Sequence, residues 1–293
     1  MKKAREPFFT GENIRKIIIA VCLFAAVIIA LSMIIRYANQ KSNLDKYEEL
    51  AQQTEEPAIQ LTAEPVETAN VEEEPKQEEG SMSLAEKIQW YKDNFDIDVP
   101  EKNLDFVQLQ ENTNADIYAW IYVPNTKIDY PVLQHPTDNY YYLNYNLDGS
   151  KGYPGCIYTE NYNSKEFSDP LTVMYGHNMK NGSMFANLHL FEDSQFFDEN
   201  RYIYIYLPDD VLVYEIFASY IHSDAHLLYG TNYSDEVHFA AYIDEVLSQR
   251  SMNVNLREGV EVDTDDKILT LSTCVANQGD KRYLVQGVLL DED

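Results

Sequence analysis

A cysteine and an arginine stand at the mouth of a hairpin-like segment near the end of the sequence. In KILTLSTCVANQGDKRYLVQGVLL, Cys274 ends the first strand-like run and Arg282 begins the second. If the runs pair antiparallel and residues 275–281 connect them, the two side chains can lie opposite each other. The guanidinium keeps its proton and holds several N–H donors in a fixed fork. It could therefore favour a thiolate and bind a carbonyl oxygen or its oxyanion.

A cysteine nucleophile also needs an acid for its leaving group, and histidine is the usual choice. Of the six histidines, His177 is the one that closes a strand-like run, LTVMYGH, and a polar turn, NMKNG, follows it. This position predicts an imidazole at a sheet end, where Cys274 and Arg282 are also expected. His222 and His226 are four residues apart, but no cysteine or carboxylate pattern makes them a convincing metal site. The sequence therefore predicts no metal and no cofactor.

The chain has three cysteines, of which Cys22 lies in a long apolar run. Only Cys156 and Cys274 remain for a folded domain, so no disulfide framework is expected. Cys156, in the strand-like GYPGCIYTE, is interpreted as a small buried core residue. A single disulfide between these two cysteines, or a purely structural Cys274, is the alternative to a reactive Cys274.

Residues 17–35, IIIAVCLFAAVIIALSMII, form an unbroken apolar run that is long enough to cross a bilayer as a helix. Basic residues precede this run, so the positive-inside bias keeps residues 1–16 in the cytoplasm and places everything after Arg36 outside. A cleaved signal peptide is the alternative. The length of the run and the lack of a clean small-x-small cleavage site favour a retained anchor in a single-pass membrane protein.

Residues 36–82 are rich in Glu, Pro, Gln and Thr and almost free of aromatic residues. Such a segment buries too little apolar surface to offset chain entropy. It is predicted to be a disordered acidic stalk, helical at most up to about Leu50. Over the whole chain, 49 acidic against 22 basic residues give a formal net charge of −27. This charge argues against a nucleic-acid binder, which needs a basic surface to neutralise phosphates.

Residues 83–293 are predicted to form one mostly β domain. SLAEKIQWYKDNF begins with a capping box at Ser83 and Glu86 and predicts a helix, and NLDFVQLQENT predicts a second short one. Eight short runs of β-branched and aromatic residues follow, bounded by Pro, Gly, Asn and Asp. Eight such strands favour a closed barrel, because closure removes sheet edges. Two helices are expected to interrupt them, in GSMFANLHLF and, before the penultimate strand, in SDEVHFAAYIDEVLSQRS.

TLSTC followed by an arginine, with YGHNM upstream, resembles the sortases, membrane-anchored cysteine transpeptidases of Gram-positive cell surfaces. The stretches WIYVPNTKIDYPVLQ, DNYYYLN, GCIYTENYN and YGHNMKNGSMFANLHLFED look like class B sortases in particular. The N-terminal helical pair and the inserted helix also fit class B. The resemblance runs from about Ser83 to Leu290 and implies an eight-stranded β-barrel with its catalytic groups at one end.

The resemblance also implies roles for individual residues. Cys274 matches the nucleophile, His177 the general acid and base, and Arg282 the residue that positions substrate and stabilises the oxyanion. Four further residues are implied, less directly, to bind the sorting signal: Asn139, Leu143, Tyr175 and Ser272. Two features depart from class B. The connection from Cys274 to Arg282 is short, and Val275 and Ala276 stand where class B members often carry an acidic or aromatic residue.

The reaction that the resemblance implies is acyl transfer through a thioester. The enzyme would cleave a C-terminal sorting motif after threonine on secreted proteins and join these proteins to an amine of a lipid-linked peptidoglycan precursor. A pilin-polymerising sortase and a non-enzymatic membrane-anchored binding module are the alternatives. A papain-like protease fits poorly, because its cysteine precedes its histidine and opens a helix. An L,D-transpeptidase fits poorly too, because its arginine follows the cysteine by only a couple of residues.

Overall fold

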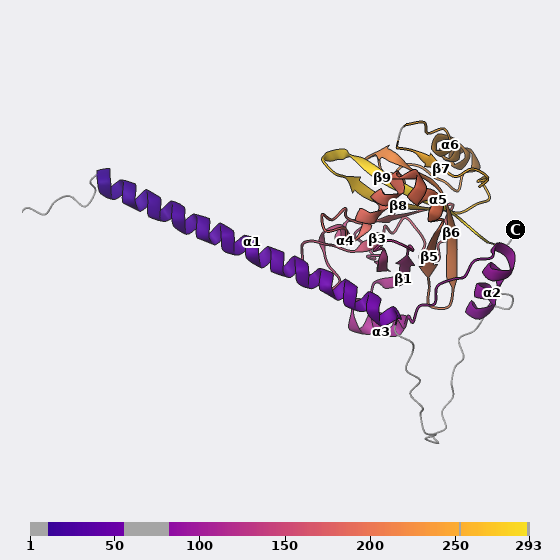
Figure 1. The fold of residues 1–293 in the computed structure, drawn as a ribbon, viewed down its shortest axis with the longest axis horizontal. Coiled ribbons are helices and arrows are strands. Elements are labelled where there is room, and N and C mark those ends of the chain that lie inside the picture. The colour runs from indigo at the N-terminus through magenta and orange to yellow at the C-terminus, as the bar shows by residue number, and fades with distance from the viewer. Residues whose placement is uncertain (1–10, 56–81, 252, 292–293) are drawn as a thin grey trace, which may run out of the picture.

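The computed structural model describes residues 11–55, 82–251 and 253–291. Most of the predicted cytoplasmic segment, and the predicted stalk from residue 56 to residue 81, lie outside the described residues. Within the described part, a long helix, α1, leads to a β-barrel that carries shorter helices around it (Figure 1).

Eight strands close into a barrel, which confirms the predicted fold. Neighbouring strands pair in the order β5–β1–β2–β3–β4–β8–β9–β6, and β6 pairs with β5 to complete the circle. A two-residue strand, β7, lies beside β6. The sheet is mixed, because β2–β3 and β4–β8 are parallel pairs. The strands are β1 (Ile117–Tyr122), β2 (Asp129–Leu133), β3 (Ile157–Thr159), β4 (Leu171–Tyr175), β5 (Tyr202–Tyr206), β6 (Val211–Ser223), β7 (Asn255–Leu256), β8 (Ile268–Val275) and β9 (Gln278–Leu289).

Apolar side chains on both faces hold the strands in place. In β1, IYAWIY, five of the six positions are buried, and Trp120 and Ile121 have no exposed surface. β6 is long enough to pair with β5 along its first half and with β9 along most of its length, and it bends at an irregularity between Ile216 and Ala218. This bend lets one strand close the barrel, as bulges commonly do at barrel corners.

The helices cover parts of the barrel. α2 (Leu84–Phe95) begins with the predicted capping box, and α3 (Phe106–Asn112) is the second N-terminal helix. α6 (Glu236–Leu247) is the predicted insertion before β8, and its buried side chains join a hydrophobic cluster with β4, β6, β8 and β9. Two short helices, α4 (Tyr141–Asn144) and α5 (Ser194–Glu199), lie in the loops after β2 and β4.

GSMFANLHLF forms a 3₁₀-helix, η1 (Phe185–Glu192), instead of an α-helix. Phe185, Leu188 and Phe191 are all fully buried. Their spacing of three residues places them on one face of a helix with three residues per turn. Burial of these three side chains therefore explains the tighter helix.

Helix α1 (Gly11–Glu55) is longer than the sequence predicts. Its apolar part is exposed, and α1 is long and apolar enough to cross a membrane. The stalk was predicted to be helical at most up to about Leu50, but the helix continues to Glu55 and its last turns lie against the barrel domain (Figure 1). Tyr47 explains the difference, because it is 2% exposed and its hydroxyl donates to the Gly155 carbonyl over 2.7 Å. Lys46 adds an ion pair with Asp148 at 2.6 Å.

The last two strands form a tighter hairpin than the sequence predicts. β9 begins at Gln278, so only Ala276 and Asn277 connect it to β8, where a connection of residues 275–281 was expected. Asn277 has a φ of 60°, the left-handed conformation that asparagine tolerates in turns. The pairing register shifts after Cys274, so residues 279–281 of β9 form a bulge relative to β8.

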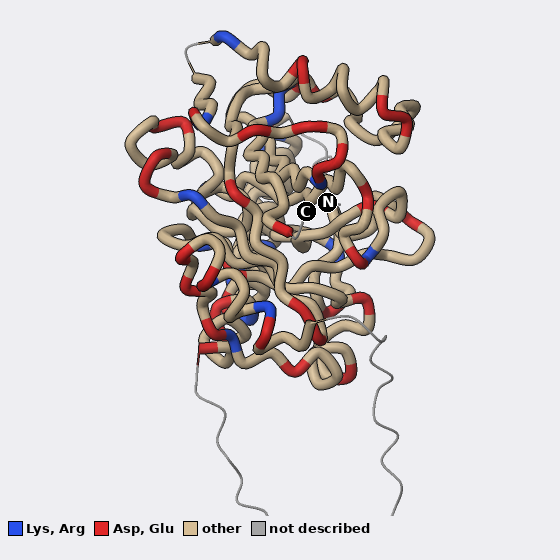
Figure 2. The backbone as a smooth tube through the Cα atoms, turned by 90° about the vertical axis from the view of Figure 1, so that its right-hand side faces the viewer, with Lys and Arg blue, Asp and Glu red and all other residues tan. Residues whose placement is uncertain are grey.

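Acidic residues are spread around the loops and helix ends of the barrel domain, and basic residues are fewer (Figure 2). A duplex or single strand of nucleic acid needs a continuous basic face. In this protein the basic residues lie among a larger number of acidic ones, as the formal net charge of −27 implies.

Candidate active site

Sheet register brings His177 and Cys274 to the same end of the barrel. In the parallel pair β4–β8, Tyr175 lies opposite Ser272. His177 and Cys274 each follow two residues later, on the same faces as these partners. The Thr273 hydroxyl donates to the carbonyl of the glycine before His177 over 2.8 Å, which keeps the two chain segments side by side.

The antiparallel pair β8–β9 adds the arginine. Arg282 lies directly opposite Cys274, as the sequence predicts. Its Nη1 donates to the carbonyls of Gly279 and Lys281, at 3.1 and 2.9 Å. These bonds hold the partly buried guanidinium over the hairpin. The bulged residues of β9 thus orient the arginine side chain.

One cavity of about 520 Å³ has all three side chains in its wall. Leu143, Tyr175 and Ser272 also line it. The cavity extends between the segment around α4, the end of β4, the β8–β9 hairpin and the loop after β6. A peptide lying in this cavity would therefore meet the sulfur, the imidazole and the guanidinium together.

Cys274 is exposed at the end of β8. Its own carbonyl accepts hydrogen bonds from Asn178 Nδ2 at 2.8 Å and from His189 Nε2 at 3.0 Å, so its backbone is fixed while its thiol stays accessible. Cys156 and Cys274 are both free. The alternatives of a joining disulfide and of a buried structural Cys274 therefore do not hold.

The ring of His177 is fixed by a backbone carbonyl. Its Nε2 lies 2.7 Å from the carbonyl oxygen of Leu143, and because this oxygen can only accept, Nε2 carries a proton. Nδ1 is then the nitrogen that gains or loses a proton. Burial lowers the pKa of His177, and the bond to the Leu143 carbonyl opposes that shift. The imidazole is therefore neutral at neutral pH unless a nearby anion stabilises its charged form.

Gly155 allows the loop before β3 to approach this ring. A Cβ atom there would lie 2.8 Å from the Tyr142 carbonyl oxygen and 3.3 Å from the His177 ring, and its φ is +70°. Any larger residue would meet both a backbone clash and a strained conformation. On the same side, the ring of Tyr153 lies edge-on to the His177 ring, with centroids 5.0 Å apart.

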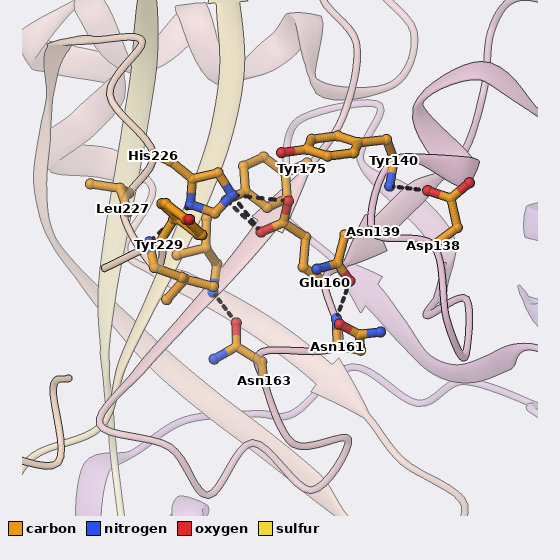
Figure 3. Close-up of polar contacts among 12 residues, drawn as sticks. Asp138, Asn139, Tyr140, Glu160, Asn161, Asn163, Tyr175, His226, Leu227 and Tyr229 are labelled. Atoms are coloured by element: carbon orange, nitrogen blue, oxygen red, sulfur yellow. Dashed lines mark hydrogen bonds and ion pairs between the residues drawn. The ribbon is translucent and has the colours of Figure 1, made fainter. Parts of the chain in front are cut away.

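The four residues predicted to bind the sorting signal lie in different surroundings. Leu143, Tyr175 and Ser272 line the cavity. Asn139 does not belong to its wall, and the Asn139 Oδ1 accepts a hydrogen bond from the Asn161 backbone N–H at 2.8 Å (Figure 3). Asn139 therefore fixes the loop after β3, beside the cavity.

Sequence reasoning assigned no role to the ion pair between Glu160 and His226. Glu160, in the cavity wall, is 2% exposed, and its Oε2 lies 3.0 Å from His226 Nε2 (Figure 3). The Tyr175 hydroxyl donates to Glu160 over 3.4 Å. Burial raises the pKa of Glu160, and His226 opposes that shift. The pair joins the loop after β6 to the end of β3, a contact that no local sequence pattern indicates.

His222 and His226 contact different carboxylates. His222 Nε2 lies 3.7 Å from Glu245, on α6, whereas His226 pairs with Glu160. Among the described residues, no group of three or more histidine, cysteine or carboxylate side chains could hold a metal ion.

Comparison with known proteins agrees with this geometry. The model of the sortase domain matches residues 121–290, more than half of the chain. Sortase B of Listeria monocytogenes is 34% identical over 182 residues, which make up 61% of this chain and 72% of that protein. The X-ray structure of Clostridium perfringens sortase B has a TM-score of 0.56 and 31% identity, and the match covers 64% of this chain and 100% of that one.

The structure of a Staphylococcus aureus sortase B–substrate complex matches with a TM-score of 0.60 over 86% of this chain and 98% of that one, at 21% identity. At this identity the likeness shows the fold alone. The family match and the closer relatives show more: this chain belongs to the sortase family, and it is a class B sortase, an enzyme of the cysteine transpeptidase type.

Proposed function

We propose that the enzyme cleaves a C-terminal sorting motif after threonine on secreted proteins and transfers them, through a thioester on Cys274, to an amine of a cell-wall peptidoglycan precursor. The observation that carries the proposal is the shared cavity, whose wall contains Cys274, His177 and Arg282 together. The substrate specificity, the acceptor and the roles of these residues are part of the proposal.

In the first half of the reaction, the Cys274 sulfur attacks the carbonyl carbon of the substrate threonine, the residue after which the sorting motif is cut. The oxygen of that carbonyl becomes an oxyanion, and the Arg282 guanidinium donates hydrogen bonds to it. The C–N bond breaks, and the departing amine takes a proton from Nδ1 of His177. Because thiolate and imidazolium stabilise each other, their titration belongs to the pair and not to either group alone.

In the second half, a primary amine attacks the thioester carbonyl. Its proton passes to Nδ1 of His177, the C–S bond breaks, and the sulfur leaves as a thiolate. One amide bond replaces another, so the reaction needs no nucleotide. The site returns to its starting charge after each cycle.

The apolar part of α1 fits a membrane anchor. We infer that the N-terminus lies in the cytoplasm and the barrel domain outside, because basic residues precede the apolar run. Protease added to intact cells should then remove the barrel domain and leave the N-terminus protected. Survival of the barrel in intact cells, with loss after lysis, would contradict this orientation.

The reaction is tested with the full chain in detergent micelles and a library of quenched fluorescent peptides that vary the residues before a threonine. We expect cleavage after threonine, and intact-protein mass spectrometry should detect an acyl adduct on the peptide that contains Cys274. Hydroxylamine should release the adduct as a hydroxamate. Cleavage without an adduct, or an adduct on Cys156, would contradict the mechanism.

A further inference from the structure

A second cavity, of about 860 Å³, also opens onto the reacting groups. Cys274 and His177 line both cavities, whereas Arg282 lines only the first. A carbonyl that must meet both the sulfur and the guanidinium has to enter from the first cavity. The second cavity therefore reaches the thioester from the side on which the base, but not the oxyanion donor, is found.

One wall of this second cavity is the anchor helix itself. The residues of α1 that line it follow the pattern i, i+3, i+4, i+7, i+8, i+11 over three turns, so they form one face of the helix. They are Tyr37, Gln40, Lys41, Leu44, Asp45 and Glu48. The opposite wall is the loop after β4, residues 178–181.

The barrel domain holds this wall in a fixed position. Tyr47, on the neighbouring face of α1, is buried and bonded to the Gly155 carbonyl, and Lys46 pairs with Asp148. Gly155 in turn lies against the His177 ring. The position of α1 is thus coupled to the catalytic histidine through one short loop.

The second cavity starts next to the membrane. The apolar run ends at residue 35, and Tyr37, the first lining residue, lies only about 3 Å further along the helix at about 1.5 Å per residue. Glu48, the last lining residue, lies about 20 Å from the end of the run by the same measure. The cavity therefore extends along the helix from the membrane surface toward the sulfur.

The charges along this face change with distance from the membrane. Lys41 lies nearer the membrane, and the exposed carboxylates of Asp45 and Glu48 lie further from it. The opposite wall contains a second exposed cation, Lys180. Carboxylates attract an ammonium group, and they are placed where an incoming amine would pass on its way to Cys274. The neutral imidazole of His177 can then take the proton that the attacking nitrogen loses.

We propose that this second cavity is an acceptor cleft, built partly by the anchor helix, which binds the amine-bearing peptide of a membrane-bound acceptor. The inference rests on the proposed transpeptidase function. In the step concerned, the acceptor nitrogen forms a C–N bond with the thioester carbonyl, the C–S bond breaks, and the proton goes to His177 Nδ1. The acceptor reaches the sulfur along α1 and not through the first cavity.

The test uses the full chain in lipid nanodiscs at low salt, with a cleavable sorting peptide as acyl donor. Two amines serve as acceptor probes, triglycinamide and Nα-acetyl-lysinamide, and hydroxylamine serves as a nucleophile too small to need a cleft. We expect Asp45→Lys to raise the KM for the amine probes about fivefold or more. Asp45→Trp, which also fills the cleft, should raise it about tenfold or more.

Matched controls are Glu49→Lys and Glu49→Trp. Glu49 is exposed on the same helix but lines a different cavity. Hydrolysis and hydroxylamine capture of the thioester should stay within twofold of the parent in all four variants. Equal KM values for the amines in the Asp45 and Glu49 variants would overturn the acceptor cleft. Absence of hydroxylamine capture in the parent would instead overturn the proposed function, so the two failures are distinguishable.

Discussion

Two cysteines of the barrel domain have opposite surroundings. Cys156 is 1% exposed, its Sγ donates to the Tyr145 carbonyl over 3.4 Å, and burial raises the pKa of its thiol to about 12. Cys274 is exposed at a strand end, in a cavity with an imidazole and a guanidinium. The thiolate is the nucleophilic form of cysteine, so the interior keeps one thiol inert while the barrel rim presents the other for reaction.

This contrast also shows what the barrel contributes. The sheet contributes strand ends at a fixed spacing: Cys274 and Arg282 lie opposite each other at the β8–β9 hairpin, and His177 lies two residues past the paired Tyr175. Such positions are held in place by strand pairing, yet they lie next to the ends of strands, where Cys274 is exposed. Cys156 lies just before β3, where Tyr47 of α1 contacts it and the thiol is buried.

The largest expected effect separates the two cysteines directly. Cys274→Ala should lower the rate of sorting-peptide cleavage by about 10³-fold or more, since no other group replaces the nucleophile. Cys156→Ala should keep the rate within about threefold. Initial rates in micelles, with circular dichroism to check folding, measure both. A large loss in Cys156→Ala despite a native spectrum would break the comparison.

A smaller effect concerns the charge beside the reactive thiol. Arg282→Lys should lower kcat/KM by about 10²-fold, because a point charge cannot replace the fork of donors at the oxyanion. Arg250→Lys, at the end of α6, is the matched control and should stay within twofold. Near-parental turnover in Arg282→Lys would mean that guanidinium geometry does not matter.

The smallest effect concerns the histidine, which is partly buried although it lies at the reactive rim. Burial lowers the pKa of His177 below its ordinary value of 6.5, so the unfolded chain binds a proton first on acidification. The stability that neutral His177 contributes is therefore present above about pH 6.5 and is lost as pH falls through the lowered pKa. His177→Gln should reduce the fall in melting temperature between pH 7 and pH 5 by on the order of a degree or two.

The control for this measurement is His238→Gln, a change at an exposed histidine of α6. Its melting temperature should fall with pH as the parent's does. An unchanged fall in His177→Gln would show that burial at the rim is too slight to affect the imidazole. His177 would then behave like an exposed residue, and the difference between the barrel interior and its rim would be larger than the structure indicates.

The sequence predicts the barrel and the hairpin pair well because both depend on local patterns. Short runs of β-branched and aromatic residues, bounded by Pro, Gly, Asn and Asp, identify the strands, and counting along the hairpin puts Cys274 opposite Arg282. The capping box at Ser83 likewise predicts the start of α2. Each of these inferences uses neighbouring residues only.

The contacts that the sequence does not predict join distant segments. Tyr47 gives no sign in its acidic surroundings that it packs under the loop before β3, so the sequence did not predict that α1 packs on the barrel or that it extends to Glu55. The pair of Glu160 and His226 depends on how the loop after β6 folds back over β3. Asn139, chosen by resemblance alone, lies beside the cavity and not in its wall.

The parallel pairing of β4 with β8 places His177 next to Cys274, and from the chain between these strands Asn178 and His189 add hydrogen bonds to the Cys274 carbonyl. Both β5 and β6, together with η1, α5 and α6, are formed by this intervening chain. Loops that come after η1, including the one that carries α6, can therefore lengthen or shorten without moving the sulfur relative to the imidazole. Substrate preference can change by such changes in length while the chemistry stays the same.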